Sequence, residues 1–147
     1  MILVLFGQPH SGKSTLAKYL KAYLKDSNIV YSHIDGDELR SLFKNTDYSK
    51  QGRINNLQKA SDIAHYLSSV TPVVILSLVY PYTEAREYLD SLNSEVMWVY
   101  LHYTGNRGRE EYHVEDFDIP TDIDMTIDTS EENEIVSALK ILKLITK

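Results

Sequence analysis

Short apolar runs alternate with amphipathic stretches along this chain of 147 residues. The runs are rich in Val and Ile, which is typical of strands that are buried on both faces of a sheet. They predict five strands, at Ile2–Phe6, Ile29–Ile34, Val73–Leu78, Val96–Leu101 and Met125–Ile127. Between these runs, apolar residues follow the spacing of an α-helix. This spacing predicts helices over about residues 13–25, and through residues 54–67 and 135–145.

Polar residues indicate where two of the helices begin. Thr129 with Glu132 predicts a capping box, and Thr83 with Glu84 predicts a capped first turn. Strands and helices therefore alternate throughout, which predicts an α/β fold with three layers, in which a parallel sheet of about five strands lies between helices. No repeat, linker or change of composition divides the chain, so we expect a single domain over residues 1–147. In such a sheet, ligands bind at the carboxyl ends of the strands.

The composition is that of an ordinary soluble globular protein, with 43% hydrophobic and 24% charged residues. The chain has no cysteine, which excludes a disulfide framework, thiolate metal ligands and a cysteine nucleophile. Its apolar runs are far shorter than the ~20 residues of a membrane span. Met1 leads directly into apolar residues without the basic segment of a signal peptide. We therefore expect a cytoplasmic protein with no membrane partner.

The net charge of −6 is unevenly divided along the chain. Residues 1–59 carry a net +4 and residues 60–147 a net −10, and residues 110–134 contain eleven acids but no Lys or Arg. Such a stretch repels a nucleic-acid backbone, so we expect no nucleic-acid polymer as a partner. A small anionic ligand bound by residues 1–59 fits this division. An alternative is that the acids only solvate a surface.

The first predicted strand leads into GQPHSGKS, which fits the phosphate-loop (P-loop) pattern G-x-x-x-x-G-K-[ST] in full and precedes a predicted helix. Its glycines let backbone N–H groups approach phosphate oxygens, and the helix adds its positive end. In this pattern Lys13 bridges the β- and γ-phosphates of ATP, and the Ser14 hydroxyl binds Mg²⁺. The alternative is a Gly-rich connection with an incidental lysine. The predicted nucleotide-binding residues are Gly7, Gln8, Pro9, His10, Ser11, Gly12, Lys13, Ser14 and Thr15.

The second predicted strand ends in DGDELR, at the same edge of the sheet as the phosphate loop. One of the two carboxylates, Asp35 or Asp37, would hold Mg²⁺ through water, while the other accepts the proton of a hydroxyl group. In the structural alternative, Asp37 starts a short helix as its cap and Asp35 is exposed. The neighbouring phosphate loop favours the catalytic interpretation.

The segments GQPHSGKST, IDGDELR, YSKQGRINNLQKA, SLVYPY and VEDFDIP follow one another in an order and spacing that resembles the adenylylsulfate kinases. Members of that family use ATP to phosphorylate the 3′-hydroxyl of adenosine 5′-phosphosulfate. The resemblance implies a P-loop kinase fold, ATP with Mg²⁺, and a small nucleotide as substrate. Asp35 resembles the family's base toward the 3′-hydroxyl, so Lys13, Asp35 and Asp37 are the predicted catalytic residues. Family members are often dimers, and the apolar content of this chain permits a homodimer.

The same resemblance implies which residues bind the acceptor nucleotide. Arg40, Arg53 and Asn56 look like the family's contacts to it. Arg53 and Asn56 are three residues apart, so they share one face of a helix and can offer a guanidinium and an amide to one ligand. Phe43 or Tyr48 is an aromatic residue that can stack on an adenine.

The chain departs from the family pattern near the substrate. Gly52 stands where the family has Asp, Gln58 and Lys59 stand where it has an Arg pair, and Tyr80 replaces a Ser. After the fourth predicted strand, the family has a long lid where this chain has only residues 102–120. In this stretch Arg107 and Arg109 are predicted to reach the γ-phosphate as the loop closes, the alternative being two solvated arginines.

We predict an ATP-dependent kinase that acts on the 3′-hydroxyl of adenosine 5′-phosphosulfate. The alternatives are a P-loop kinase for another small hydroxyl metabolite or nucleoside, a nucleotide-binding switch module, and a relative that binds nucleotides without catalysis.

We expect Trp98 in the core. The remaining histidines, which show no metal-ligand spacing, are expected to be non-catalytic; they are His33, His65, His102 and His113.

Overall fold

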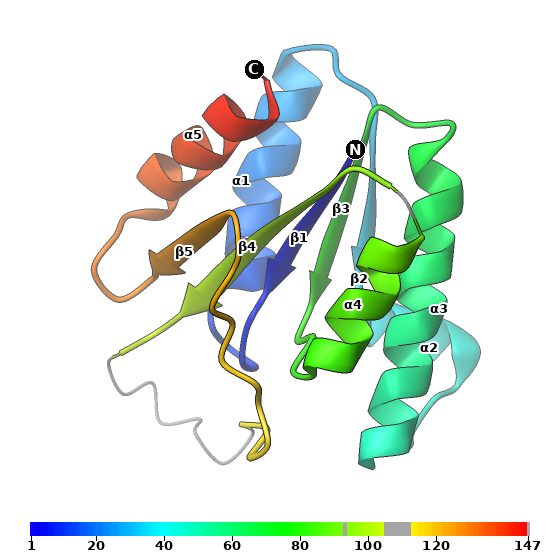
Figure 1. Cartoon of the computed structure of the whole chain (residues 1–147). Coiled ribbons are helices and arrows are strands. Elements are labelled where there is room, and N and C mark those ends of the chain that lie inside the picture. The colour runs from blue at the N-terminus through cyan, green and yellow to red at the C-terminus, as the bar shows by residue number, and fades with distance from the viewer. Residues whose placement is uncertain (93, 105–112, 147) are drawn as a thin grey trace.

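The computed structural model describes residues 1–92, 94–104 and 113–146. Within these residues, the chain forms a parallel sheet of five strands in the order β2-β3-β1-β4-β5 (Figure 1). The strands are β1 (Ile2–Phe6), β2 (Tyr31–Asp35), β3 (Val73–Leu78), β4 (Val96–His102) and β5 (Met125–Asp128). β1 therefore lies in the middle of the sheet.

β1 and β3 have the predicted bounds, whereas the other three strands end one residue further along the chain. β2 also begins later than predicted, because the residues before it still belong to the end of the preceding helix. Asn28 adopts a φ of 58°, and the Ile29 N–H donates to the Leu24 carbonyl oxygen at 2.9 Å. This is the hydrogen-bond pattern of a Schellman motif, which ends a helix.

Helices cover both faces of the sheet, which confirms the three-layer α/β fold. One face carries α1 (Lys13–Asp26) and α5 (Glu134–Ile145), and the other carries α2 (Gly36–Phe43), α3 (Lys50–Ser68) and α4 (Thr83–Ser91) (Figure 1).

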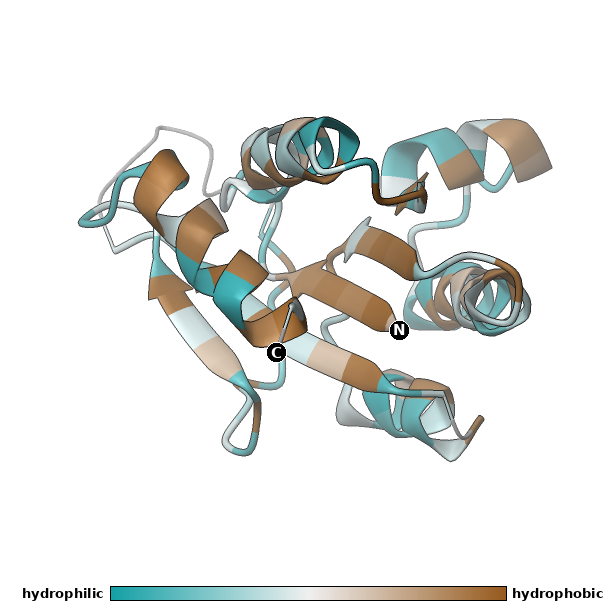
Figure 2. Ribbon diagram, turned by 90° about the horizontal axis from the view of Figure 1, so that it is seen from above, coloured by the Kyte–Doolittle hydropathy of each residue, from teal (hydrophilic) through white to brown (hydrophobic). Residues whose placement is uncertain are grey.

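Alternate residues of β1 enter two hydrophobic cores. Leu3 and Leu5 pack on the side of α1 and α5, while Val4 and Phe6 pack on the side of α3 and α4. Trp98 lies in this second core, as predicted. The central strands are accordingly brown, and therefore hydrophobic, in Figure 2, whereas the helices carry both hydrophobic and hydrophilic positions.

The predicted capping residues are wrong at both helices. The N-cap of α5 is Asn133, whose side chain accepts a hydrogen bond from the first turn. Thr129 instead donates its hydroxyl to the Ser11 carbonyl oxygen at 2.8 Å, and so supports the loop after β1. α4 does begin at Thr83, but the Thr83 N–H donates to the distant carboxylate of Asp118 at 2.8 Å.

The parallel strands all end at one edge of the sheet, where β1 leads into the phosphate loop and β2 leads directly into α2. This edge is where the sequence motifs meet. Over residues 1–92, 94–104 and 113–146, no helix has the length and hydrophobicity to cross a membrane.

Candidate functional site

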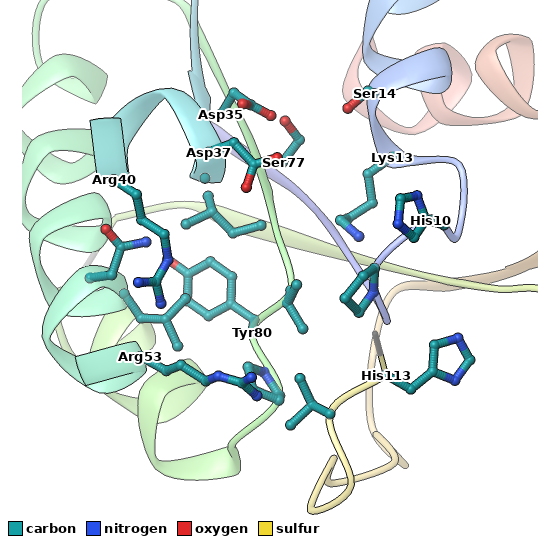
Figure 3. A pocket seen from close by; sticks show the side chains of 18 of the residues that line it. His10, Lys13, Ser14, Asp35, Asp37, Arg40, Arg53, Ser77, Tyr80 and His113 are labelled. Carbon is teal, nitrogen blue, oxygen red and sulfur yellow. The ribbon is translucent and has the colours of Figure 1, made fainter. Parts of the chain in front are cut away.

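A cavity of about 910 Å³ opens at the carboxyl edge of the sheet. It is lined by the loop between β1 and α1, the start of α2, one face of α3 and the chain that follows β3. Figure 3 shows Lys13 and Ser14 on one side of this cavity, and Asp35, Asp37 and Arg40 on the other. The motifs found separately along the sequence therefore surround one space.

The phosphate loop is packed closely against the end of β4. A Cβ atom at Gly7 would overlap the carbonyl oxygen of Leu101, and the backbone at Gly12 adopts a φ of 104°. Both positions therefore require glycine. The hydrogen bond from Thr129 to Ser11 adds a link to the end of β5. These contacts fix the position of the loop relative to β4 and β5.

The side-chain ammonium of Lys13 lies inside this loop. Nζ donates to the carbonyl oxygens of Gln8 at 2.8 Å and Gly7 at 3.1 Å. Burial lowers the pKa of Lys13 to about 8, and the negative charges of Asp37 and Asp35 oppose part of this shift. At neutral pH the loop thus contains a buried cation, which favours the binding of an anion such as a phosphate group.

We expect nucleotide binding to take up protons at alkaline pH. Near pH 8 about half of the free protein has a neutral Lys13, and the charge of a bound diphosphate raises the pKa of this lysine. In metal-free buffer at pH 8, binding of ADP should therefore be accompanied by the uptake of roughly half a proton at Lys13. At about pH 6.5, Lys13 is already protonated, so binding should cause almost no proton uptake at this residue. Calorimetry in buffers of different ionisation enthalpy measures this number. Equal heats in all buffers at pH 8 would contradict a titrating Lys13.

The predicted nucleotide-binding residues divide into a lining set and a supporting set. Gly7, Gln8 and Ser11 form the supporting set, because they lie behind the cavity wall. The cavity itself is lined by Pro9, His10, Gly12, Lys13, Ser14 and Thr15.

Residues 113–118 are tied to the phosphate loop and to α4. The Gln8 side chain donates to the Val114 carbonyl oxygen at 2.9 Å and accepts from the Val114 N–H at 2.8 Å. Arg86, which is buried, donates to the Asp118 carbonyl oxygen at 2.6 Å. These bonds place His113 and Val114 at the cavity wall.

Asp35 has a structural role and also lines the cavity. Its carboxylate accepts the Glu38 N–H at 3.1 Å as the N-cap of α2. The cap is therefore Asp35 and not Asp37, and it is Asp37 that is exposed, although both line the cavity. Figure 3 shows the Asp35 carboxylate and the Ser14 hydroxyl pointing toward each other.

The hydroxyl of Ser14 and the carboxylates of Asp35 and Asp37 fit a magnesium ion that is bound mainly by phosphates and water. Mg²⁺ usually binds one or two protein oxygens together with substrate phosphates. Ser14, Asp35 and Asp37 offer such oxygens around one cavity. In the part of the chain that the structure describes, no three His, Asp or Glu residues form a metal site by themselves.

The other end of the cavity carries Arg53 and Asn56 from α3, and Arg40 from α2. Arg40 is partly engaged, because its Nη1 donates to the Asp47 carbonyl oxygen at 3.1 Å and to Asn45. Asn56 is only 4% exposed, and its Oδ1 has no partner among the described residues. Buried polar atoms are rarely left unpaired, so this oxygen is available to accept a hydrogen bond from water or from a ligand in the cavity.

Phe43 does not line the cavity, which corrects one predicted contact. It is the last residue of α2, where the chain turns away, and the Lys59 ammonium lies 4.7 Å from its ring centroid. Gln58 and Lys59 are exposed and also lie outside the cavity. Tyr48 does line it, with the Arg40 guanidinium 4.1 Å from its ring centroid. Tyr48 is thus the aromatic residue available to a base.

Packing explains two departures from the family pattern. A Cβ atom at Gly52 would overlap the carbonyl oxygen of Asp47, so the loop before α3 requires glycine here. The Tyr80 ring is fully buried, packs edge-on against Trp98 at 5.4 Å between centroids, and its hydroxyl is 2.9 Å from that of Ser61. Tyr80 also lines the cavity and has a φ of 45°, which is uncommon for a non-glycine residue.

Sequence reasoning gave no role to Ser77, the first residue of the SLVYPY segment, or to His113, yet both line the cavity. Ser77 is the one polar residue in the fully buried strand β3, and that isolated polarity is the signal that could have revealed it. His113 had no comparable signal, since its position depends on distant hydrogen bonds. The predicted lid arginines, Arg107 and Arg109, lie outside the described residues.

Comparisons with known proteins agree with this site. The sequence model of the adenylylsulphate kinase family matches residues 1–110. The chain is 36% identical over 89 residues to the cytidine diphosphoramidate kinase of Campylobacter jejuni, a match that covers 59% of this chain and 51% of that protein. It is 33% identical over 92 residues to the adenylyl-sulfate kinase of Saccharomyces bayanus, covering 62% and 46%. The matched region is thus about half the length of these relatives.

The fold is also similar to that of a solved kinase. The APS kinase of Mycobacterium tuberculosis, in complex with AMPPNP and APS, superposes with a TM-score of 0.88 at 18% identity, over 99% of this chain and 97% of that one. At this identity the likeness concerns the fold alone. The family model, in contrast, spans the phosphate loop, the DGDELR segment and α3. This chain therefore belongs to the adenylylsulphate kinase family.

Proposed function

We propose that this chain is an ATP-dependent kinase that transfers the γ-phosphate to the 3′-hydroxyl of adenosine 5′-phosphosulfate, with residues 1–147 acting as one catalytic domain. The main support is that one cavity holds the buried Lys13 cation at one end, and Arg53 beside the unpartnered Asn56 oxygen at the other. A guanidinium binds an anion, and a free amide oxygen accepts a hydroxyl or amino hydrogen. A nucleotide acceptor offers both kinds of group.

Asp35 lines the same cavity and would accept the proton of the acceptor hydroxyl. The hydroxyl oxygen attacks the γ-phosphorus in line while the bond to the ADP oxygen breaks. Lys13 neutralises negative charge on the phosphates during this step. Ser14, with Asp37 through water, would hold Mg²⁺, which would supply further positive charge beside the phosphates. Because the transition state of phosphoryl transfer is loose, positioning and charge neutralisation should supply most of the rate enhancement.

Cytidine diphosphoramidate is a second candidate acceptor, supported by two observations. The relative named for that substrate shares 36% identity with this chain, against 33% for the yeast adenylyl-sulfate kinase. In addition, the bulky Tyr80 lines the cavity where the family pattern has a serine. A pyrimidine base needs less room beside this ring than a purine does.

A substrate panel tests the proposal. The protein is incubated with ATP, Mg²⁺ and either adenosine 5′-phosphosulfate or cytidine diphosphoramidate, with AMP and CDP as controls. ADP release gives the rate, and mass spectrometry identifies the product. Formation of 3′-phosphoadenosine 5′-phosphosulfate supports the proposal, whereas turnover of the cytidine compound alone would replace it with the second candidate. ADP release without any phosphorylated product would reject both.

We expect Arg53→Gln to raise the KM for the acceptor about 10- to 100-fold, since a hydrogen bond to a charged group contributes about 1.5–3 kcal/mol. The KM for ATP should stay unchanged, because Arg53 lies away from the phosphate loop. Lys59→Gln, an exposed position on the same helix, is the matched control. Steady-state kinetics with each substrate varied in turn would measure both constants. An equal rise in the KM for ATP and the KM for the acceptor would mean that Arg53 supports the fold and does not bind the acceptor.

A further inference from the structure

Three polar side chains form a hydrogen-bonded row that ends at the cavity. The Lys21 Nζ of α1 lies 3.1 Å from Nδ1 of His33 on β2, and His33 Nε2 lies 2.6 Å from the Ser77 hydroxyl of β3. Ser77 is 3% exposed and lines the cavity. Lys21 and His33 lie outside the sequence motifs, and Ser77 is the first residue of the SLVYPY segment, for which the sequence indicated no role.

The chemistry of Lys21 determines the direction of every proton in this row. An ammonium group only donates, so Nδ1 of His33 accepts and the proton of the neutral imidazole is on Nε2. Nε2–H therefore donates to the Ser77 oxygen. The hydroxyl proton of Ser77 is then directed away from His33, and it reaches no acceptor within the described residues.

Ser77 lies on β3 between β1, which leads into the phosphate loop, and β2, which ends at Asp35. In the sheet register it is opposite Leu5 of β1, the strand that leads into the phosphate loop. On its other side it is opposite Asp35 of β2. Figure 3 shows Ser77 beside Asp35 and Asp37, on the wall that faces Lys13. A donor at this place is between the phosphate loop and the proposed base.

We propose that Ser77 binds an oxygen of the γ-phosphoryl group through its hydroxyl proton, and that His33 and Lys21 are positioning residues that orient this hydroxyl. The proposal rests on phosphoryl transfer at this cavity, but it does not depend on which acceptor is used. It assigns a site role to three residues that the P-loop motif does not contain.

The test compares two nucleotides that differ in the γ-phosphate. Binding of ADP and of AMPPNP to the whole chain is measured by calorimetry with Mg²⁺. We expect Ser77→Ala to weaken AMPPNP binding about tenfold or more and to leave ADP binding unchanged, as expected for a lost hydrogen bond to a charged group. Ser77→Thr keeps a hydroxyl, so it should retain most of the AMPPNP affinity that Ser77→Ala loses. Ser137→Ala removes a buried serine of α5 far from the cavity and is the matched control.

Unchanged binding of both nucleotides by Ser77→Ala, or equal weakening of both, would overturn the proposal. Because no acceptor is present, a failed substrate panel and a failed Ser77 test remain separate results. If AMPPNP binding depends on Ser77 but no acceptor is phosphorylated, only the proposed kinase function fails.

The positioning role is tested by a double-mutant cycle. His33→Leu should reduce AMPPNP affinity in the wild-type background and have no further effect in the Ser77→Ala background. His33→Gln can still donate a hydrogen bond from its side-chain amide, so it should lose less AMPPNP affinity than His33→Leu does. Nitrogen-15 NMR of the imidazole should show a protonated Nε2 and an unprotonated Nδ1. Additive effects of His33→Leu and Ser77→Ala, or the opposite tautomer, would contradict the orienting role.

Discussion

The Lys13→Ala variant is expected to lose phosphoryl transfer almost completely, with kcat lowered by at least about 10³-fold. Lys13 is the single lysine among the described residues that line the cavity, and its ammonium lies within the phosphate loop. In a loose transition state, negative charge builds up on the leaving oxygen between the β- and γ-phosphates, and a fixed cation beside these phosphates stabilises it. Steady-state kinetics with the acceptor found in the substrate panel would measure the loss.

Lys18→Ala is the control for this variant, since Lys18 is an exposed residue on α1. It removes the same charge and should retain normal turnover. Lys13→Ala should fold normally, because it removes a cation whose burial is unfavourable, and a thermal melt would verify this. Turnover by Lys13→Ala close to that of the unchanged protein would refute the proposed site.

Asp35→Asn should lower kcat about 10²- to 10⁴-fold, which is the usual contribution of a positioned general base. The amide cannot take up the hydroxyl proton. ATP binding should persist, because the phosphate loop is untouched. Asparagine is also a good N-cap, so the bond from the Glu38 N–H that starts α2 is retained. The variant therefore separates the chemical role of Asp35 from its structural one.

Two further variants complete this test. Glu38→Gln removes a neighbouring exposed charge and should have little effect on kcat. Asp35→Ala removes both the base and the helix cap. Its kcat should match that of Asp35→Asn, and its free energy of unfolding should be lower by about 1 kcal/mol. Full activity of Asp35→Asn would mean that this residue serves only as the cap of α2.

Much of the fold could be predicted because its signals are local. β1 and β3 lie inside the sheet and are buried along their whole length, so their apolar runs mark both ends. The start of β2 was misjudged because the apolar residues Ile29 and Val30 belong to the turn that ends α1. Thr129 resembled a cap in sequence, but its hydroxyl contacts a loop more than a hundred residues away in the chain.

The functional site likewise has a part that local sequence predicts and a part that it does not. The phosphate loop and the DGDELR segment are contiguous, and their spacing alone indicates which groups face a ligand. The link between His33 and Ser77 joins two strands, so no pattern along the chain reveals it. The choice between Phe43 and Tyr48 depended on where α2 ends and how the next loop folds back onto Arg40. That loop is held by hydrogen bonds among the side chains and backbone of residues 40–52, whose geometry cannot be read from the spacing of residue types.

During biosynthesis, β1 leaves the ribosome well before the strands that flank it. Its register partners are Val74 on β3 and Val96 on β4. At the usual rate of translation, about 5–20 s pass before β4 has been made. Until β3 has been made, Ile2–Phe6, which are fully buried in the finished sheet, have no neighbouring strand to pair with, and their second neighbour, β4, follows later. The nascent chain therefore exposes its most hydrophobic strand for longest, and this is the segment that chaperones would be expected to protect.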